Sequence, residues 1–193
     1  MTITLSEISL RKFTNEDIAL VLEKHKTLYA EEFGFPPEKF GKMVSDGLDE
    51  LVTSHGMMWI AEYRAGASDS MQAEASENTA ESSVWAGSVA IVPMDGSTGR
   101  LRFMLIDPTF RGCGLSKYLL QTALDYCRQK NYRRVTLSTT ANCVSAHRLY
   151  RKNGFAPFKI IHGTEWGGST DEWWEKELES IEEQEVKDEV KYS

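Results

Sequence analysis

The sequence predicts a single α/β domain with about seven strands and about four helices. The 193 residues suit one ordinary domain and are few for two. The apolar fraction of 41% and the charged fraction of 26% are those of a globular chain. Strand-like apolar runs and amphipathic helical segments follow one another in the order strand, two helices, three strands, helix, strand, helix, two strands. This mixed order places the chain in the α/β class.

The first half of the chain is expected to form a strand, two helices and a pair of strands. ISLRKF reads as a strand, after which Val21, His25 and Leu28 follow the helical period. GFPP breaks this helix, and a second helix is predicted over residues 38–52. MMWIAEY and VWAGSVAIVP then read as paired strands.

The second half is expected to add a strand, a helix, a strand, a short helix and two closing strands. GRLRFMLIDP reads as a strand that Asp107 and Pro108 end. After a glycine turn, a helix with an apolar face runs to about Gln129. RRVTLSTT is the next strand, and the helix after it stops at Asn153 and Gly154. APFKIIHG and DEWWEKEL close the sheet.

Two acidic segments carry the net charge of −7. Residues 65–83 hold four acidic residues and no Lys or Arg, and residues 177–193 hold seven acidic residues and two basic ones. The rest has 20 basic and 18 acidic residues, so it lacks the clustered basic face of a nucleic-acid-binding protein. Because residues 65–83 have few large apolar side chains, we expect a disordered hairpin insertion. The predicted domain spans residues 1–178, and residues 179–193 form an acidic C-terminal tail.

The cysteines and the apolar runs predict a cytoplasmic protein. Cys113, Cys127 and Cys143 are odd in number and lack metal-like spacing, so we expect reduced thiols and no metal. No apolar run approaches the roughly 18 residues that cross a bilayer. The N-terminus shows no secretory signal, and no membrane partner is expected.

The segment FRGCGLS, between a strand and a helix, predicts a pyrophosphate cradle. The first N–H groups of a helix have no partner within it, and the helix dipole adds partial positive charge there. Gly112 and Gly114 have no Cβ, which lets a ligand approach the backbone, and Arg111 adds a full charge. The spacing fits neither a Walker loop nor a dinucleotide fingerprint. A glycine-rich helix start without a ligand is the alternative.

A second motif follows one strand later. ANCVSAHRLYRKNGF holds the pattern N-x3-A-x2-L-Y-x-K-x-G-F. Over about residues 100–156, the two motifs together resemble the GCN5-related N-acetyltransferase (GNAT) family. The resemblance implies a mixed, mostly antiparallel sheet of about seven strands, with a splayed strand pair that binds acetyl-CoA and about four flanking helices. Ser116 departs from the family pattern, which usually has Gly or Ala at that position.

A narrower resemblance involves HKTLYAEEFGF, WIAE, GSVAIV and LRFMLIDPTFRGCGLS. These segments are similar to the acetyltransferase half of bacterial proteins that are fused to a MarR-type winged-helix regulator. The insertion at residues 65–83 sets this chain apart from them.

The family resemblance also implies which residues bind the cofactor. The pantetheine arm would pair with the backbone near Leu105 and Ile106, where an N–H would face the negative charge that develops on the thioester oxygen. Asn142 would hydrogen-bond the arm, cap a helix, or do both. The implied cofactor-binding residues are Leu105, Ile106, Arg111, Gly112, Cys113, Gly114, Leu115, Ser116 and Asn142.

Tyr150 is the predicted general acid that protonates the leaving thiolate. In the family this position faces the sulfur, and a phenol with a pKa of about 10 is protonated at neutral pH. An ordinary core tyrosine is the alternative. Glu32 is the candidate general base, with Glu31 and His25 behind it. A water relay, or a merely solvated acid at the helix end, is the alternative there.

Arg102 and Tyr29 are the predicted acceptor-binding residues. Arg102 would pair bidentately with a carboxylate and imply an amino-acid-like acceptor, unless it is an outward surface arginine. The sequence thus predicts acetyl transfer from acetyl-CoA to a primary amine of a small molecule, directly in a ternary complex. The alternatives are a protein N-terminus or lysine as acceptor, and a non-enzymatic acetyl-CoA sensor. A closed pocket containing Arg102 would favour the small molecule; an open acidic groove would favour the protein. A homodimer is left open.

Overall fold

The structure is a computed structural model that describes residues 3–64, 83–163 and 170–179 of the 193-residue chain. The predicted insertion, except for Ser83, and the predicted tail after Glu179 lie outside the described residues. The domain boundary expected after residue 178 therefore stays a prediction.

The helices and strands occur in the predicted order. The helices of the described residues are α1 Asp17–Phe33, α2 Pro37–Thr53, α3 Leu115–Gln129 and α4 Val144–Lys152. The strands are β1 Ile8–Lys12, β2 Met57–Tyr63, β3 Val84–Pro93, β4 Thr98–Ile106, β5 Arg134–Thr140, β6 Ala156–Ile161 and β7 Asp171–Glu177. Two short 3-10 turns, η1 Leu5–Glu7 and η2 Pro108–Phe110, precede β1 and follow β4. Gly34 ends α1 in the left-handed conformation with a φ of 68°, as the GFPP breaker suggests.

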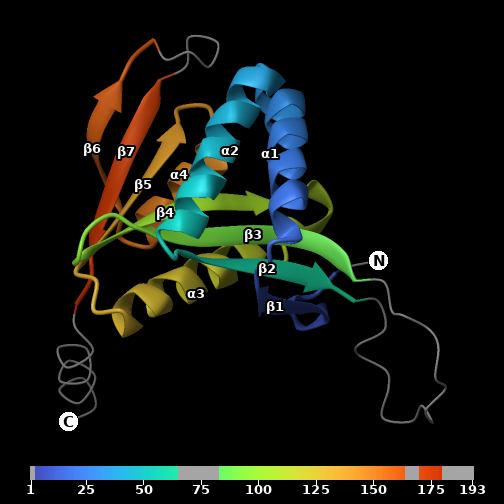
Figure 1. Ribbon diagram of the computed structural model, residues 1–193, viewed down its shortest axis with the longest axis horizontal. Coiled ribbons are helices and arrows are strands. Elements are labelled where there is room, and N and C mark those ends of the chain that lie inside the picture. The colour runs from blue at the N-terminus through green and yellow to red at the C-terminus, as the bar shows by residue number, and fades with distance from the viewer. Residues whose placement is uncertain (1–2, 65–82, 164–169, 180–193) are drawn as a thin grey trace.

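The strands form one sheet in the order β1-β2-β3-β4-β5-β7-β6. Within the described strands, every neighbouring pair is antiparallel except β4 and β5, which are parallel. Figure 1 shows α1 and α2 side by side over one face of the sheet and α3 along the opposite face. The predicted α/β fold, with a mostly antiparallel seven-stranded sheet and four helices, is confirmed.

Two hydrophobic clusters hold the helices against the sheet. One packs Leu119 of α3 and Tyr150 of α4 around the fully buried Trp174 of β7 and its neighbours. The other packs Val21 of α1 and Leu48 of α2 against β2, β3 and β4. Burial of each aliphatic side chain of this size stabilises the folded state by about 1.5–3 kcal/mol. The two clusters therefore fix α1, α2, α3 and α4 around the second half of β4.

The strands β4 and β5 separate where the sequence places the cofactor. Their parallel pairing covers only Thr98–Leu101 with Arg134–Leu137. Just beyond it, Phe103 has a positive φ of 52°, and the register with β3 shifts between Ser88 and Ala90, as expected at a β-bulge. In Figure 1, β5, β6 and β7 run steeply relative to β3 and β4. This confirms the predicted splayed strand pair.

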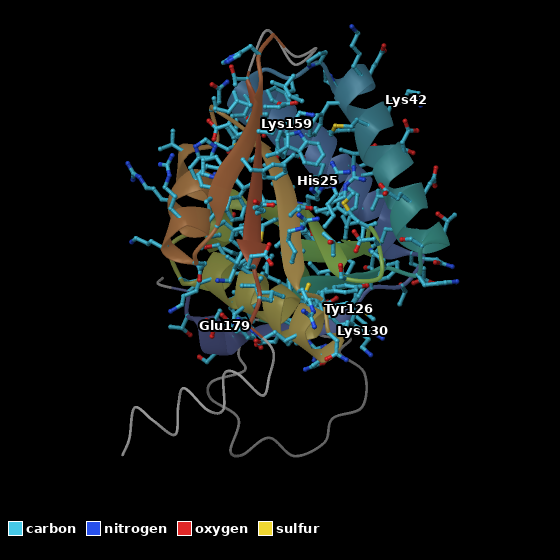
Figure 2. The ribbon with its side chains drawn as sticks, turned by 90° about the vertical axis from the view of Figure 1, so that its left-hand side faces the viewer. His25, Lys42, Tyr126, Lys130, Lys159 and Glu179 are labelled. Atoms are coloured by element: carbon cyan, nitrogen blue, oxygen red, sulfur yellow. The ribbon has the colours of Figure 1, made fainter. Side chains whose placement is uncertain are left out.

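The outer strand β6 leaves apolar side chains in solvent. All of its residues are exposed, including Phe158, Ile160 and Ile161. It is one edge of the sheet, and Figure 2 shows Lys159 on this strand. The homodimer considered from the sequence stays a prediction.

Candidate active site

Two adjoining cavities lie around the gap between β4 and β5. The first has a volume of about 280 Å³ and the second a volume of about 570 Å³. They share part of their walls, made by Tyr29, Met104, Cys143, Ala146 and Tyr150. A molecule in the first cavity and a molecule in the second can therefore meet at Tyr150.

The glycine turn borders the first cavity, with Arg111 and Gly112 in its wall. Gly112 and Gly114 have positive φ angles of 85° and 93°, and outside their chain neighbours no described heavy atom lies within 4 Å of the Cβ that another residue would place there. The first helical hydrogen bond of α3 runs from the Tyr118 N–H to the Gly114 carbonyl. The N–H groups of the preceding turn thus have no helical acceptor. This open, donor-rich backbone suits a phosphate group.

Arg111 joins the end of β4 to the end of α1. Its guanidinium donates two hydrogen bonds to the Glu32 carboxylate, at 2.6 and 3.1 Å, and two more to the Ile106 carbonyl, at 3.1 and 3.3 Å. Glu32 therefore lies beside the proposed cradle and not in the second cavity. The predicted cation of the cradle and the predicted base are an ion pair in this structure.

The predicted cofactor-binding residues are only partly gathered in the first cavity. Those that line it are Leu105, Ile106, Arg111, Gly112, Leu115 and Ser116. Among described residues, Cys113 and Gly114 are not part of the wall, and Cys113 instead donates its thiol hydrogen to the Phe110 carbonyl. Asn142 is exposed, lines neither cavity, and forms no side-chain cap for α4, which has Cys143 at its N-cap position.

Tyr150 is buried where the two cavities meet. Its residue exposure is 5%, and its ring packs against Phe155 at 5.7 Å between centroids. Burial, and to a lesser extent Cys143, raises the pKa of the Tyr150 phenol above its usual value of 10. The phenol is therefore protonated at neutral pH. Within the described part of the chain, no hydrogen bond occupies its hydroxyl.

The predicted acceptor residues both line the second cavity. Tyr29 stacks on Phe40 at 4.4 Å between centroids, and Arg102 lies in the wall with its side chain only 14% exposed. Arg102 donates to the Glu50 carboxylate at 2.6 Å. A Cβ on Gly47 would lie 2.2 Å from the Arg102 guanidinium, so this glycine lets the charge approach α2. Arg102 is thus an inward-facing residue and not an outward surface arginine.

Arg100 was not recognised from the sequence. It lines the second cavity, and its guanidinium carbon lies 4.6 Å from the centre of the Trp173 ring. Its Nε is buried and has no hydrogen-bond partner. Leaving such a donor unpaired costs about 1–3 kcal/mol. The alternation of strand residues offered a signal, because Arg100 and Arg102 are two positions apart and share one face of β4.

Asp171, at the start of β7, is a second residue that the sequence reading missed. It lines the second cavity, and one of its carboxylate oxygens, Oδ1, is buried without a partner. Burial raises the pKa of this carboxyl group above its usual value of 3.8. Asp171 is therefore a more basic carboxylate than a solvated one. It lines the second cavity, whereas Glu32 lines the first.

His25 lies inside the second cavity as a neutral side chain. It is 4% exposed, and its Nδ1 is 2.8 Å from the Val21 carbonyl oxygen, which fits the tautomer with a proton on Nδ1. Figure 2 shows it toward the interior, whereas Lys42 lies at the outer side of α2. Burial, and to a smaller extent the charge of Arg102, lowers its pKa from 6.5 to about 4. It is a poor proton acceptor at neutral pH.

We expect His25 to make folding sensitive to acid. Because its pKa is 6.5 in the unfolded chain and about 4 in the folded one, the unfolded state takes up a proton first as the pH falls. The free energy of unfolding should decrease between these pH values by about 3 kcal/mol on this account. Urea unfolding of wild type and His25→Gln across this window measures the difference. The exposed His162→Gln is the control, and equal slopes in all three proteins would contradict the assignment.

The described residues contain no group of three His, Cys, Asp or Glu side chains placed to bind a metal ion. Among the same residues, none of the helices is both long enough and apolar enough to cross a membrane.

Comparison with known proteins identifies the class. The sequence profile of the Acetyltransferase (GNAT) family matches residues 47–155, more than half of the chain. The chain belongs to this family. Proteins of this family use acetyl-CoA. The general resemblance seen in the sequence is confirmed, whereas the likeness to MarR-type fusions stays a prediction.

Individual relatives differ in how much of the chain they match. An uncharacterized N-acetyltransferase of Escherichia coli, YjgM, is 28% identical over 76% of this chain and 80% of its own length. The N-acetylaspartate synthetase of Danio rerio is 41% identical over 61 residues, which are 32% of this chain and 22% of that protein. The match thus spans only about a fifth of that curated relative.

Solved structures share the fold. Ard1 from Thermoplasma volcanium has a TM-score of 0.66 at 18% identity, covering 90% of this chain and 99% of that one. A spermidine N-acetyltransferase from Vibrio cholerae, solved with CoA and spermine, has a TM-score of 0.62 at 13% identity, covering 89% and 96%.

Proposed function

We propose that this enzyme acetylates the primary amine of a small molecule that carries a carboxylate, with both substrates bound together. The observation that carries this proposal is the shared wall between the two cavities. The first cavity offers backbone donors and Arg111, whereas the second offers the half-buried Arg100 and Arg102. Tyr150 lies where their contents would react.

The residues of the first cavity fit acetyl-CoA. Gly112 and Gly114 leave the turn open, and the start of α3 presents N–H groups to a pyrophosphate. Beyond Leu101, β4 no longer pairs with β5, so the edge of β4 that faced β5 is open to a pantetheine arm near Leu105 and Ile106, where Arg111 holds the Ile106 carbonyl. When bound, acetyl-CoA supplies the acetyl group as a thioester.

The residues around the reacting atoms supply protons and remove them. Tyr150 holds a proton at its phenol oxygen and donates it to the departing sulfur. Two carboxylates can accept the proton of the amine: Glu32, which pairs with Arg111, and Asp171, which lines the second cavity. The sequence favoured Glu32, and we retain both as proposals.

The second cavity favours an acceptor with a carboxylate over a polyamine. Arg102 faces inward with its forked donors, which match a carboxylate bidentately. The name of the N-acetylaspartate synthetases describes an acetylated amino acid, in line with this proposal. A spermidine-like polycation would instead have to approach two half-buried arginines. Because Arg102 lies inside a cavity, a small acceptor is favoured over a protein chain.

The test is thiol release from acetyl-CoA across amino acids, polyamines, arylamines and short peptides. We expect turnover with amino acids and little with spermidine. Turnover confined to peptides would overturn the small-molecule acceptor, and turnover confined to polyamines would overturn the carboxylate.

Arg102→Met should weaken binding of the acceptor without affecting binding of acetyl-CoA. Loss of a charge-assisted contact predicts a KM for the amino acid raised about tenfold, with acetyl-CoA affinity unchanged. Steady-state kinetics against both substrates measures this. Glu50→Gln is the matched control, because it removes the ion-pair partner of Arg102 and keeps the guanidinium. If both variants raise KM equally, the ion pair supports only the fold.

A further inference from the structure

The second cavity contains two arginines on one face of one strand. Arg100 and Arg102 alternate along β4, and both line the cavity. Burial lowers the pKa of Arg100, the nearby positive charge of Arg102 lowers it further, and the Glu50 carboxylate acts in the opposite direction to a smaller extent. Two half-buried like charges on one wall are unfavourable unless anions offset both of them.

Among the described residues, the carboxylates of the cavity form no ion pair with Arg100, although Glu50 offsets part of its charge from a distance. Arg102 pairs with Glu50 at 2.6 Å. On α2, Lys42 pairs with Asp46 at 2.8 Å. In the described part of the chain, Arg100 forms no ion pair, and its buried Nε has no partner.

The Trp173 ring orients Arg100. A guanidinium stacked on an aromatic face, here 4.6 Å from the ring centre, keeps its in-plane N–H groups pointing sideways. Those donors are what a carboxylate accepts in a bidentate pair. A purely structural arginine in this position would be expected to use its buried Nε on a protein oxygen.

We propose that Arg100, stacked on Trp173, is a second anion subsite of the acceptor cavity. The acceptor is then an amino dicarboxylate, with one carboxylate at Arg102 and the other at Arg100. This inference rests on the proposed function, and it names the substrate class of the same site.

The first experiment needs no variant. Thiol release by wild type is measured with aspartate and glutamate, with their side-chain amides asparagine and glutamine, and with alanine. We expect kcat/KM for the better dicarboxylate to exceed that for its own amide at least about tenfold, since the amide differs by one charge and keeps the shape. Equal kcat/KM values would overturn the second subsite.

The second experiment removes the subsite. Arg100→Met should lower kcat/KM for the dicarboxylate at least about tenfold and change kcat/KM for the amide less than about threefold. Arg134→Met is the matched control, because Arg134 is on β5, lines neither cavity, and changes the net charge equally. Arg100→Lys, which keeps a charge, serves if Arg100→Met does not fold, and it should retain part of the preference.

The outcomes separate the two proposals. If amino acids of every kind are inert while polyamines or peptides are acetylated, the proposed function is wrong. If aspartate and asparagine react alike and Arg100→Met affects both alike, the second subsite is wrong and the proposed function stands.

Discussion

Replacing Tyr150 with Phe lowers kcat about 100-fold or more and leaves the affinity for acetyl-CoA within about twofold. The phenylalanine keeps the ring that packs on Phe155 and removes only the proton donor. Because burial raises the pKa of Tyr150, the wild-type phenol is protonated throughout the neutral range. A thiolate that must leave unprotonated is a poorer leaving group, so the loss falls on the chemical step.

The measurement is kcat by thiol release, together with the acetyl-CoA Kd by calorimetry. Tyr118→Phe is the control, since Tyr118 is exposed on α3 and lines neither cavity. A Tyr150→Phe enzyme with wild-type kcat would remove Tyr150 as the acid. An equal loss in Kd and in kcat/KM would make it a binding residue.

Arg111→Ala weakens acetyl-CoA binding about 10- to 100-fold and lowers kcat much less. The variant removes the guanidinium that lines the first cavity beside the glycine turn. The effect should shrink as salt is raised, because the Arg111 side chain is 45% exposed. Calorimetry of acetyl-CoA at low and high salt measures it, and an unchanged Kd would contradict the cradle.

A variant of Glu32, the ion-pair partner of Arg111, is the most informative comparison for Arg111→Ala. In Glu32→Gln the arginine loses its carboxylate, so acetyl-CoA should bind as tightly as in wild type or more tightly. If Glu32 is the general base, kcat of this variant also falls; if Asp171 is, kcat falls in Asp171→Asn instead. The raised pKa of Asp171 predicts that the acidic limb of the kcat profile lies above the pH at which a solvated carboxylate titrates.

The order and bounds of the elements could be predicted because each has a strong local signal. GFPP and the Asn153-Gly154 pair stop helices through backbone conformation, and the structure ends α1 and α4 there. The long apolar faces of α2 and α3 repeat with the helical period. These signals depend only on residues that are close in sequence, so they can be recognised before the fold is known.

The candidate site could be predicted only where its residues lie within one motif. The glycine turn and Tyr150 belong to contiguous patterns, and both line the first cavity. Arg100 and Asp171 belong to none. Their significance depends on Trp173 and on burial, which arise only when β4, β5 and β7 come together. The Glu32–Arg111 ion pair joins residues far apart in sequence, so it could not be predicted before the fold was known.

The division of the site into two cavities bears on how such enzymes diversify. The wall that is unique to the second cavity comes largely from α2 and from the first half of β4, whereas the glycine turn and the start of α3 serve only the first. Substitutions on α2 can therefore alter which amine is accepted while the acyl donor stays the same. A side chain at Gly47 would meet the flexible end of Arg102 and displace its guanidinium from its present position. We expect homologues that accept another class of amine to carry a side chain at position 47.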